Sequence, residues 1–223
     1  MTKIRTVSQL SDKLSEEIAW RKKELIYIKS LIEKNRYKSV ESTLIRSGTA
    51  LLYAHWEGFI KNAATSYVEF VARQNLKYSE LAPSFLALSV KRQLHEAQES
   101  YRAVIFTKVV DFLIAGLESK CSIQWDDAIK TQSNLNSEVL KDIICILGLD
   151  YSFYETKEKI IDETLLRSRN EIAHGQYLLM QFDQYIELHR EIISLLDLFK
   201  DQIENASTSR AYLRTTKSKS FLV

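Results

Sequence analysis

Hydrophobic residues recur with the period of an α-helix over most of this chain. In the first 35 residues they follow one another at steps of three, four and seven positions: Leu10, Leu14, Ile18, Leu25, Ile28 and Ile32. Such steps place side chains on one face of a helix. Similar stripes predict helices over residues 8–35, 39–74, 83–97, 101–114, 137–147, 155–174 and 181–205, and a polar stretch at 118–133 predicts a loop. Because no segment shows strand-like alternation, we expect an all-α bundle of long amphipathic helices.

The composition agrees with long helices joined by short connections. The 223 residues include 5 glycines and 1 proline, too few for the many tight turns of an all-β fold. Pro83 stands where a helix is expected to begin, and Gly148 and Gly175 stand where helices are expected to end. The chain is long enough for one large domain with a sizeable core.

Charge is unevenly distributed between the body of the chain and its end. The formal net charge is +2, but residues 206–223 contain no acid and four bases, Arg210, Arg214, Lys217 and Lys219, which leaves 2 − 4 = −2 for the rest. We expect a domain over residues 1–206 and a basic, flexible tail over 207–223. The tail suits contact with RNA phosphates, and it equally suits a solvated chain end.

Other classes of protein and site find little support in the sequence. No apolar run approaches 18 residues and the first residues are polar, so we expect a soluble cytoplasmic protein that contacts no membrane. Cys121 and Cys145 are expected to be reduced and buried. No set of His, Cys, Asp and Glu has metal-ligand spacing, and no glycine-rich phosphate loop is present. We therefore predict neither a metal nor a cofactor.

The segment from Leu165 to Gly175 is the most informative one. Its sequence is Leu-Leu-Arg-Ser-Arg-Asn-Glu-Ile-Ala-His-Gly, so Arg169 and Asn170 precede His174 near the end of an amphipathic helix. A histidine at a helix end is also favoured by the helix dipole alone, with a nearby arginine as an ion-pair partner. The asparagine next to Arg169 and the glycine after His174 favour a functional motif.

This motif resembles the signature of the HEPN superfamily, in which Arg is followed by Asn, His or Asp and then, three to four residues later, by His. The resemblance implies a HEPN-like helical fold and a metal-independent endoribonuclease that leaves 2′,3′-cyclic phosphate and 5′-OH ends. It also implies a homodimer whose motifs share one cleft. His174 is expected to be the acid/base, Arg169 to bind the transition state, and Asn170 to orient the histidine or the phosphate.

A second segment, from Leu51 to Lys61, adds to the resemblance. It contains Trp56-Glu57-Gly58-Phe59 within the second expected helix, which is similar to the MAE-type branch of HEPN-like nucleases. Glu57 and Arg46 share a helix face, so Glu57 is expected to pair with Arg169 or Arg167, and Arg46 to add positive charge to the cleft. Gly58 is expected to allow close approach of another helix, for which the helix with Arg169 is one candidate. A buried Trp56 beside a routine Glu57 ion pair is the alternative.

The angular spacing of the motif bears on how it works. At 100° a residue, Arg167 and Asn170 lie on the same side as His174, whereas Arg169 points about 140° away. A regular helix therefore cannot bring Arg169 and His174 to one phosphate. The two residues could meet at one phosphate if the helix unwound at Gly175, or if a second protomer supplied one of them. The family resemblance favours the second protomer.

Tyr177 is included among the residues expected to support RNA binding. In the toxin–antitoxin branch of HEPN proteins a modifiable tyrosine stands two positions after the motif histidine, where this chain has Gln176. That departure puts in doubt a regulation of this chain by modification of such a tyrosine.

The predicted function is an RNA-cleaving toxin or antiviral effector with an inhibitory or activating protein partner. One alternative is a HEPN-fold scaffold that binds RNA or protein without catalysis. Another is an all-α interaction domain unrelated to HEPN, in which the motif is a coincidence.

Overall fold

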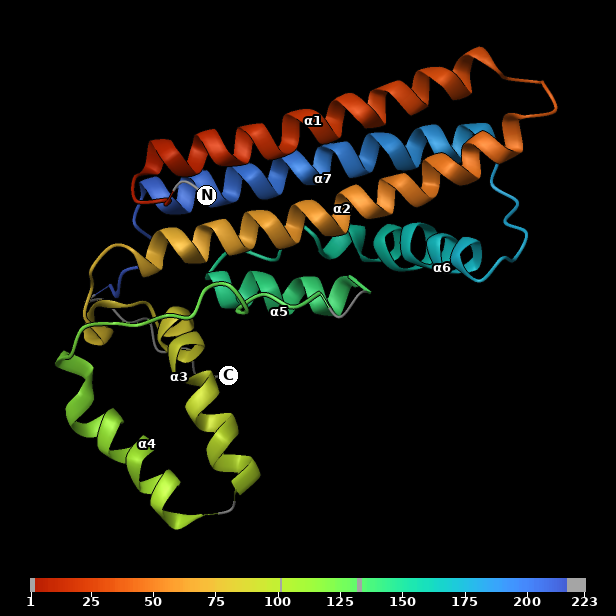
Figure 1. Ribbon diagram of the computed structural model, residues 1–223. Coiled ribbons are helices and arrows are strands. Elements are labelled where there is room, and N and C mark those ends of the chain that lie inside the picture. The colour runs from red at the N-terminus through yellow and green to blue at the C-terminus, as the bar shows by residue number, and fades with distance from the viewer. Residues whose placement is uncertain (1–2, 101, 132–133, 216–223) are drawn as a thin grey trace.

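A computed structural model describes residues 3–100, 102–131 and 134–215, except for the side chains of 92–97, 99 and 100. Seven α-helices account for most of these residues (Figure 1): α1 (Val7–Lys34), α2 (Glu41–Ala72), α3 (Pro83–Ser100), α4 (Ala103–Ala115), α5 (Ser137–Leu147), α6 (Arg167–Ala173) and α7 (Phe182–Thr208). Extended pairing in the described residues consists of two isolated bridges, Lys77 with Lys120 and Leu81 with Leu213. The prediction of an all-α fold is confirmed. None of these helices has the length and apolar character needed to span a membrane.

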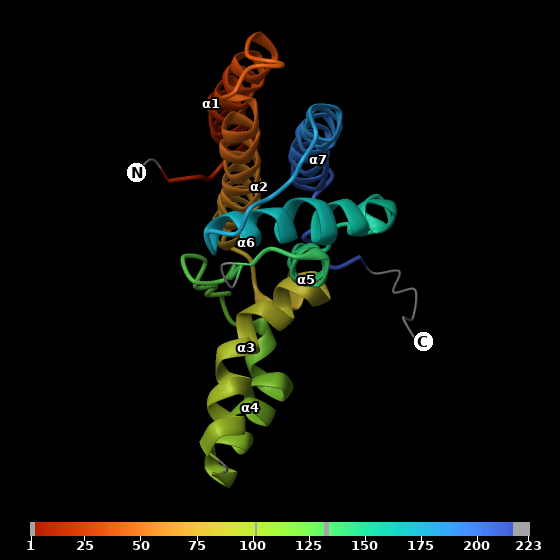
Figure 2. The same cartoon turned by 90° about the vertical axis from the view of Figure 1, so that its right-hand side faces the viewer.

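The three long helices α1, α2 and α7 run along one another. Helix α2 lies between the other two and a second layer of helices. That second layer contains α5 and α6, while α3 and α4 form a two-helix arm that extends away from the bundle (Figures 1 and 2). Helix α2 is the centre of the core, since 16 of its 32 residues are buried. Its Trp56 is fully buried, as the structural alternative for this segment predicted.

Two glycines of α2 play different roles in helix packing. A Cβ atom on Gly48 would lie 2.7 Å from the Tyr185 hydroxyl oxygen of α7, so this glycine permits the close approach of α7. Gly58 instead faces Arg21 of α1, whose Nη2 atom would lie 3.4 Å from an added Cβ atom. The expectation that Gly58 packs against the helix with Arg169 is wrong, because the side of α2 that contains Gly58 is covered by α1.

The segment before the motif is not one continuous α-helix as the sequence predicted. It begins with a 3₁₀ turn, η3 (Glu155–Lys157), continues as a π-helical stretch, η4 (Ile160–Leu166), and ends as the α-helix α6. The N–H of Arg167 bonds to the carbonyl of Asp162, five residues back. Apolar periodicity does not distinguish the two helix types here, because the buried Ile161 and Leu165 are four positions apart, a spacing that an α-helix also places on one face.

The expected boundary between domain and tail at residue 206 falls inside packed structure. Helix α7 continues to Thr208, and Tyr212 is 5% exposed, with its ring edge-to-face against Phe70. The carbonyl of Tyr212 accepts a hydrogen bond from Ala82 N, and Arg214 N donates to the Glu80 carbonyl. Residues 207–214 are thus anchored to η1 (Tyr78–Glu80) and the start of α3. Lys217 and Lys219 lie outside the described residues.

Replacing each of the two glycines of α2 by alanine tests this packing. Gly48→Ala is expected to lower the free energy of unfolding by about 1–2 kcal/mol, because the new methyl group overlaps the buried Tyr185 ring. Gly58→Ala is the matched control. It meets only an ordinary contact and removes a mid-helix glycine, so it should raise stability by up to about 1 kcal/mol. Urea unfolding followed by circular dichroism measures both, and equal effects would contradict the assignment.

Candidate functional site

The motif lies at the C-terminal end of α6, where the chain turns back toward α7. His174 ends the helix, and Gly175 follows in the left-handed conformation with φ 71°. Gly175 N donates to the Ile172 carbonyl and Gln176 N donates to the Glu171 carbonyl, at 3.1 and 2.8 Å, which is a Schellman cap. The glycine was predicted to end the helix, and it does. The His174 side chain is exposed at this corner of the molecule.

Arg169 is half-buried and lies against α2. Its guanidinium is 4.6 Å from the centre of the Tyr53 ring, within range of a cation–π interaction. Its Nη1 atom donates to the side-chain oxygens of Asn170 at 2.8 Å and Asn134 at 3.4 Å. Of the predicted site residues, Arg169 and Asn170 are thus in direct contact, whereas Arg169 and His174 extend from different sides of α6.

Tyr53 links the arginine to the loop before α5. Its hydroxyl oxygen accepts a hydrogen bond from the Leu135 N–H at 2.8 Å, which fixes the backbone next to Asn134. Burial raises the pKa of Tyr53 to about 12, and the neighbouring carboxylate of Glu57 adds to the rise, against the opposing effects of Leu135 N–H and Arg169. The phenol is therefore neutral at physiological pH. The effect of Glu57 that the structure shows is this rise in the pKa of Tyr53.

The loop itself is tied to the π-helical segment. Asp162 accepts hydrogen bonds from Ser137 N at 2.7 Å and from Ser137 Oγ at 2.5 Å. Asn136 caps α5 by accepting from Val139 N. Asn134 therefore reaches Arg169 from a backbone that is held at several points. Sequence reasoning missed Asn134 and Tyr53, because their contacts with Arg169 join segments that are 35 and 116 residues apart in the chain.

Arg167 is paired with a carboxylate of its own helix. Its Nε atom is 3.1 Å from the carboxylate of Glu171, one turn along the same helix, and its side chain is largely exposed. The carboxylate that pairs with Arg167 is thus Glu171, four positions along the same helix, where Glu57 of α2 had been one candidate.

Arg46 holds the chain that follows the motif. Its Nη2 atom donates to the Gln176 carbonyl at 3.0 Å, and its guanidinium lies 5.6 Å from the Tyr177 ring centre. The Tyr177 hydroxyl is 3.5 Å from Ser42 Oγ, yet 71% of the residue is exposed. Arg46 and Tyr177, both predicted as supporting residues, are thus brought together beside the motif.

A second exposed tyrosine lies at the turn between α1 and α2. Tyr37 has φ 64° and is 85% exposed, and the guanidinium of Arg36 lies 4.9 Å from its ring centre. Arg36 also lies 4.2 Å from the centre of the Phe182 ring, which ties this turn to the first residue of α7. A bulky residue in the left-handed region costs free energy, on the order of 1 kcal/mol. No sequence pattern distinguished this tyrosine.

The remaining histidines have structural partners where their side chains are described. His55 is buried with Nε2 2.7 Å from Glu24 Oε2, and His189 is buried with Nε2 3.2 Å from the Leu25 carbonyl oxygen. Burial lowers the pKa of both. Both are therefore core residues, while the side chain of the fourth histidine, His95, lies outside the described part. Among the described residues no group of three or more His, Cys, Asp and Glu is arranged to hold a metal ion.

Comparison with known proteins gives a family match. A family model described as RiboL-PSP-HEPN matches residues 16–205, which include α2, α6 and both sequence segments that resembled HEPN proteins. No curated protein and no solved structure matches the chain.

Substitution of Gly175 tests how the end of α6 is held. Gly175→Ala should lower the free energy of unfolding by about 1 kcal/mol, since an L-residue is strained at φ 71° although no atom lies within 4 Å of an added Cβ atom. Gly175→Asn is the control and should cost less, because asparagine tolerates this conformation. Urea unfolding gives both values. An alanine variant as stable as the wild type would show that the backbone does not need the left-handed residue.

Proposed function

The chain belongs to the RiboL-PSP-HEPN family of the HEPN superfamily, and we propose that it is a metal-independent endoribonuclease that acts as a dimer. The superfamily is the one that the sequence predicted, whereas the MAE-type branch stays a prediction. HEPN membership by itself is compatible with RNA cleavage or with an RNA-binding scaffold. The choice between them rests on the residues at the end of α6.

The observation that favours cleavage is the combination of an exposed His174 with a held Arg169. A scaffold has no use for a histidine presented at a helix end beside an asparagine and an arginine fixed by Tyr53 and Asn134. In an enzyme each has a task. Histidine exchanges protons near neutral pH, and arginine stays charged and binds two phosphate oxygens at once.

The proposed reaction is an internal transesterification of RNA. His174 takes the proton from a ribose 2′-OH, and the 2′ oxygen forms a bond to phosphorus. The bond from phosphorus to the 5′ oxygen breaks, and that oxygen receives the proton back from His174, now acting as acid. Arg169 offsets the added negative charge on the phosphoryl oxygens. The products are a 2′,3′-cyclic phosphate and a 5′-OH, and DNA is not a substrate because it lacks the nucleophile.

The geometry of α6 favours a dimer. The helix is regular up to Ala173, so Arg169 and His174 remain about 140° apart around its axis. Arg169 is also engaged with α2, which fixes it on that side. One phosphate can then be reached by His174 of one protomer and Arg169 of another, and the two-fold symmetry of a homodimer supplies both pairs.

Two exposed tyrosines, one beside the motif and one at the turn between α1 and α2, suit single-stranded RNA. Tyr177 and Tyr37 are exposed aromatic rings, each with an arginine nearby, Arg46 and Arg36 respectively. Unpaired bases stack on such rings, and the arginines contact the adjoining phosphates. The strained backbone at Tyr37 supports a role that requires the ring to stay exposed.

The cellular role that we propose is that of a toxin or antiviral effector. An RNA-cleaving enzyme of this kind must be held inactive until it is needed, so we also propose an inhibitory or activating protein partner. Both proposals are supported by membership of the HEPN superfamily and by the damage that unregulated RNA cleavage does to a cell.

Cleavage of purified RNA in the presence of EDTA tests the proposed activity. The wild-type protein should cut single-stranded RNA and leave 2′,3′-cyclic phosphate ends. His174→Ala should lower the rate by about 10²–10⁴-fold, the usual contribution of an acid/base group. The matched control is Lys159→Ala, an exposed side chain on the segment that leads to α6, which should cleave like the wild type.

Cleavage that survives in His174→Ala would contradict the assignment of the histidine. Cleavage that stops in EDTA would contradict a metal-independent reaction. Binding of RNA without cleavage by the wild type, with any inhibitor removed, would favour the scaffold.

A further inference from the structure

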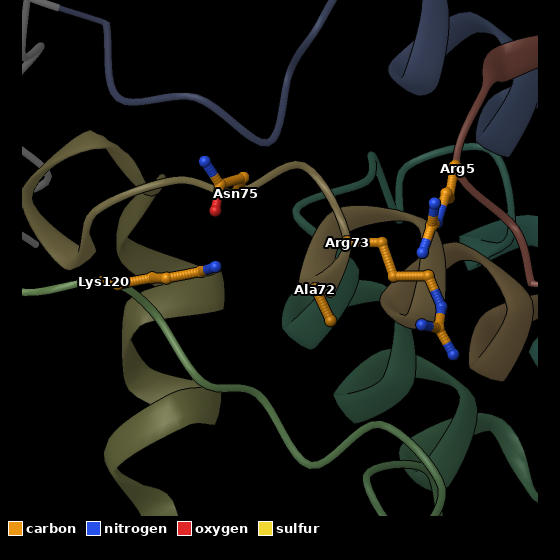
Figure 3. Close-up of a pocket in the computed structure, with 5 residues that line it drawn as sticks. All are labelled: Arg5, Ala72, Arg73, Asn75 and Lys120. Atoms are coloured by element: carbon orange, nitrogen blue, oxygen red, sulfur yellow. The ribbon is translucent and has the colours of Figure 1, made fainter.

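A pocket at the opposite end of α2 from the motif has a strongly basic lining. Its cavity of about 320 Å³ is lined by Arg5, Ala72, Arg73, Asn75 and Lys120 (Figure 3). Arg46, beside the motif, and Arg73 are 27 positions apart on one helix, which corresponds to about 40 Å. The pocket is therefore separate from the proposed ribonuclease site.

Three segments of the chain bring the cations together. Arg5 precedes α1, Arg73 ends α2, and Lys120 lies in the loop after η2 (Gly116–Glu118). Figure 3 shows Arg5 and Arg73 on one side of the pocket and the Lys120 side chain extended toward them from the other. No acidic side chain is among these lining residues.

The backbone at each cation is held in place, so the pocket is built into the fold. Arg5 N donates to the Gln9 side chain, and the Arg5 carbonyl accepts from Gln74 Nε2 at 3.1 Å. Next to Arg5, Ile4 is buried in the core. Beside Lys120, Cys121 N donates to the Leu76 carbonyl at 2.8 Å. The backbone segments that carry the cations therefore cannot move apart without breaking these contacts.

Little negative charge near the pocket offsets the cations. Glu69 accepts from Arg73 Nε at 2.7 Å and from Ile4 N, so this carboxylate is shared. Glu118 is paired with Lys77 instead. The last carbonyls of α2, the negative end of the helix dipole, accept hydrogen bonds from Arg73 N and from the backbone and side chain of Gln74. The pocket thus keeps an excess of about two positive charges.

We propose that this pocket binds a phosphomonoester, either on a free nucleotide or at the 5′ end of an RNA. A phosphomonoester has about two negative charges at neutral pH, which matches the excess in the pocket, whereas a backbone phosphodiester has one. Arginine binds two phosphate oxygens and lysine supplies a point charge. The Asn75 side chain adds an amide donor at the rim. The proposal stands whether or not the chain cleaves RNA.

Calorimetric titration with 5′-AMP tests the pocket. The wild-type protein should bind one molecule per chain at low salt, and Arg5→Glu and Lys120→Glu should each weaken binding more than about tenfold. Lys108→Glu on the exposed side of α4 makes the same change of charge far from the pocket and should leave affinity unchanged. Circular dichroism checks folding, and Lys120→Gln serves as a milder variant should Lys120→Glu unfold.

The source of the phosphate is distinguished with a 2′-O-methyl RNA oligomer, which resists cleavage, made with a 5′-phosphate and with a 5′-OH. Binding of 5′-AMP and of the phosphorylated oligomer would show that the phosphomonoester suffices. Binding of the phosphorylated oligomer alone would identify an RNA end. Equal binding of both oligomers, weakening by Lys108→Glu as large as by Lys120→Glu, or no binding of any probe at millimolar concentration would overturn the proposal.

Discussion

The burial of helix α2 is the constraint on which the other elements depend, because α1, α7, α5 and α6 all pack against it. Its large side chains, among them Tyr53, Trp56 and Phe59, fill the centre of the core, so its position is fixed along its length. Both proposed sites use this rigidity. Tyr53 receives the guanidinium of Arg169 near the middle of α2, and Arg73 lines the basic pocket where the helix ends.

The fixed position of Arg169 explains why one chain is not a complete site in this account. The guanidinium is held between Tyr53, Asn170 and Asn134, while His174 extends from another side of a regular helix into solvent. Unwinding of α6 would bring the two together only at the expense of a Schellman cap whose hydrogen bonds are well formed. A second protomer requires no such change. The division between a held arginine and an exposed histidine thus follows from packing, and the proposed dimer follows from that division.

Local features of the fold could be predicted from the sequence, and features that depend on distant contacts could not. The helices follow from periodicity, and the left-handed Gly175 follows from glycine chemistry. The π-helical stretch before α6 has the same burial pattern as an α-helix, so it was missed. For the candidate site, the sequence named Arg169, Asn170 and His174. It could not reveal Asn134 or the cations of the basic pocket, because these residues meet only when segments far apart in the chain pack together.

Mixing two inactive variants tests most directly whether Arg169 and His174 act on one phosphate from different protomers. Arg169→Ala and His174→Ala should each be inactive alone, and unfolding and refolding them together forms heterodimers. In a heterodimer one of the two sites contains both native residues, so equal amounts should recover about one quarter of the wild-type rate. A mixture that stays inactive while heterodimers are present, as shown by mass spectrometry, would place both residues in one chain and contradict the account.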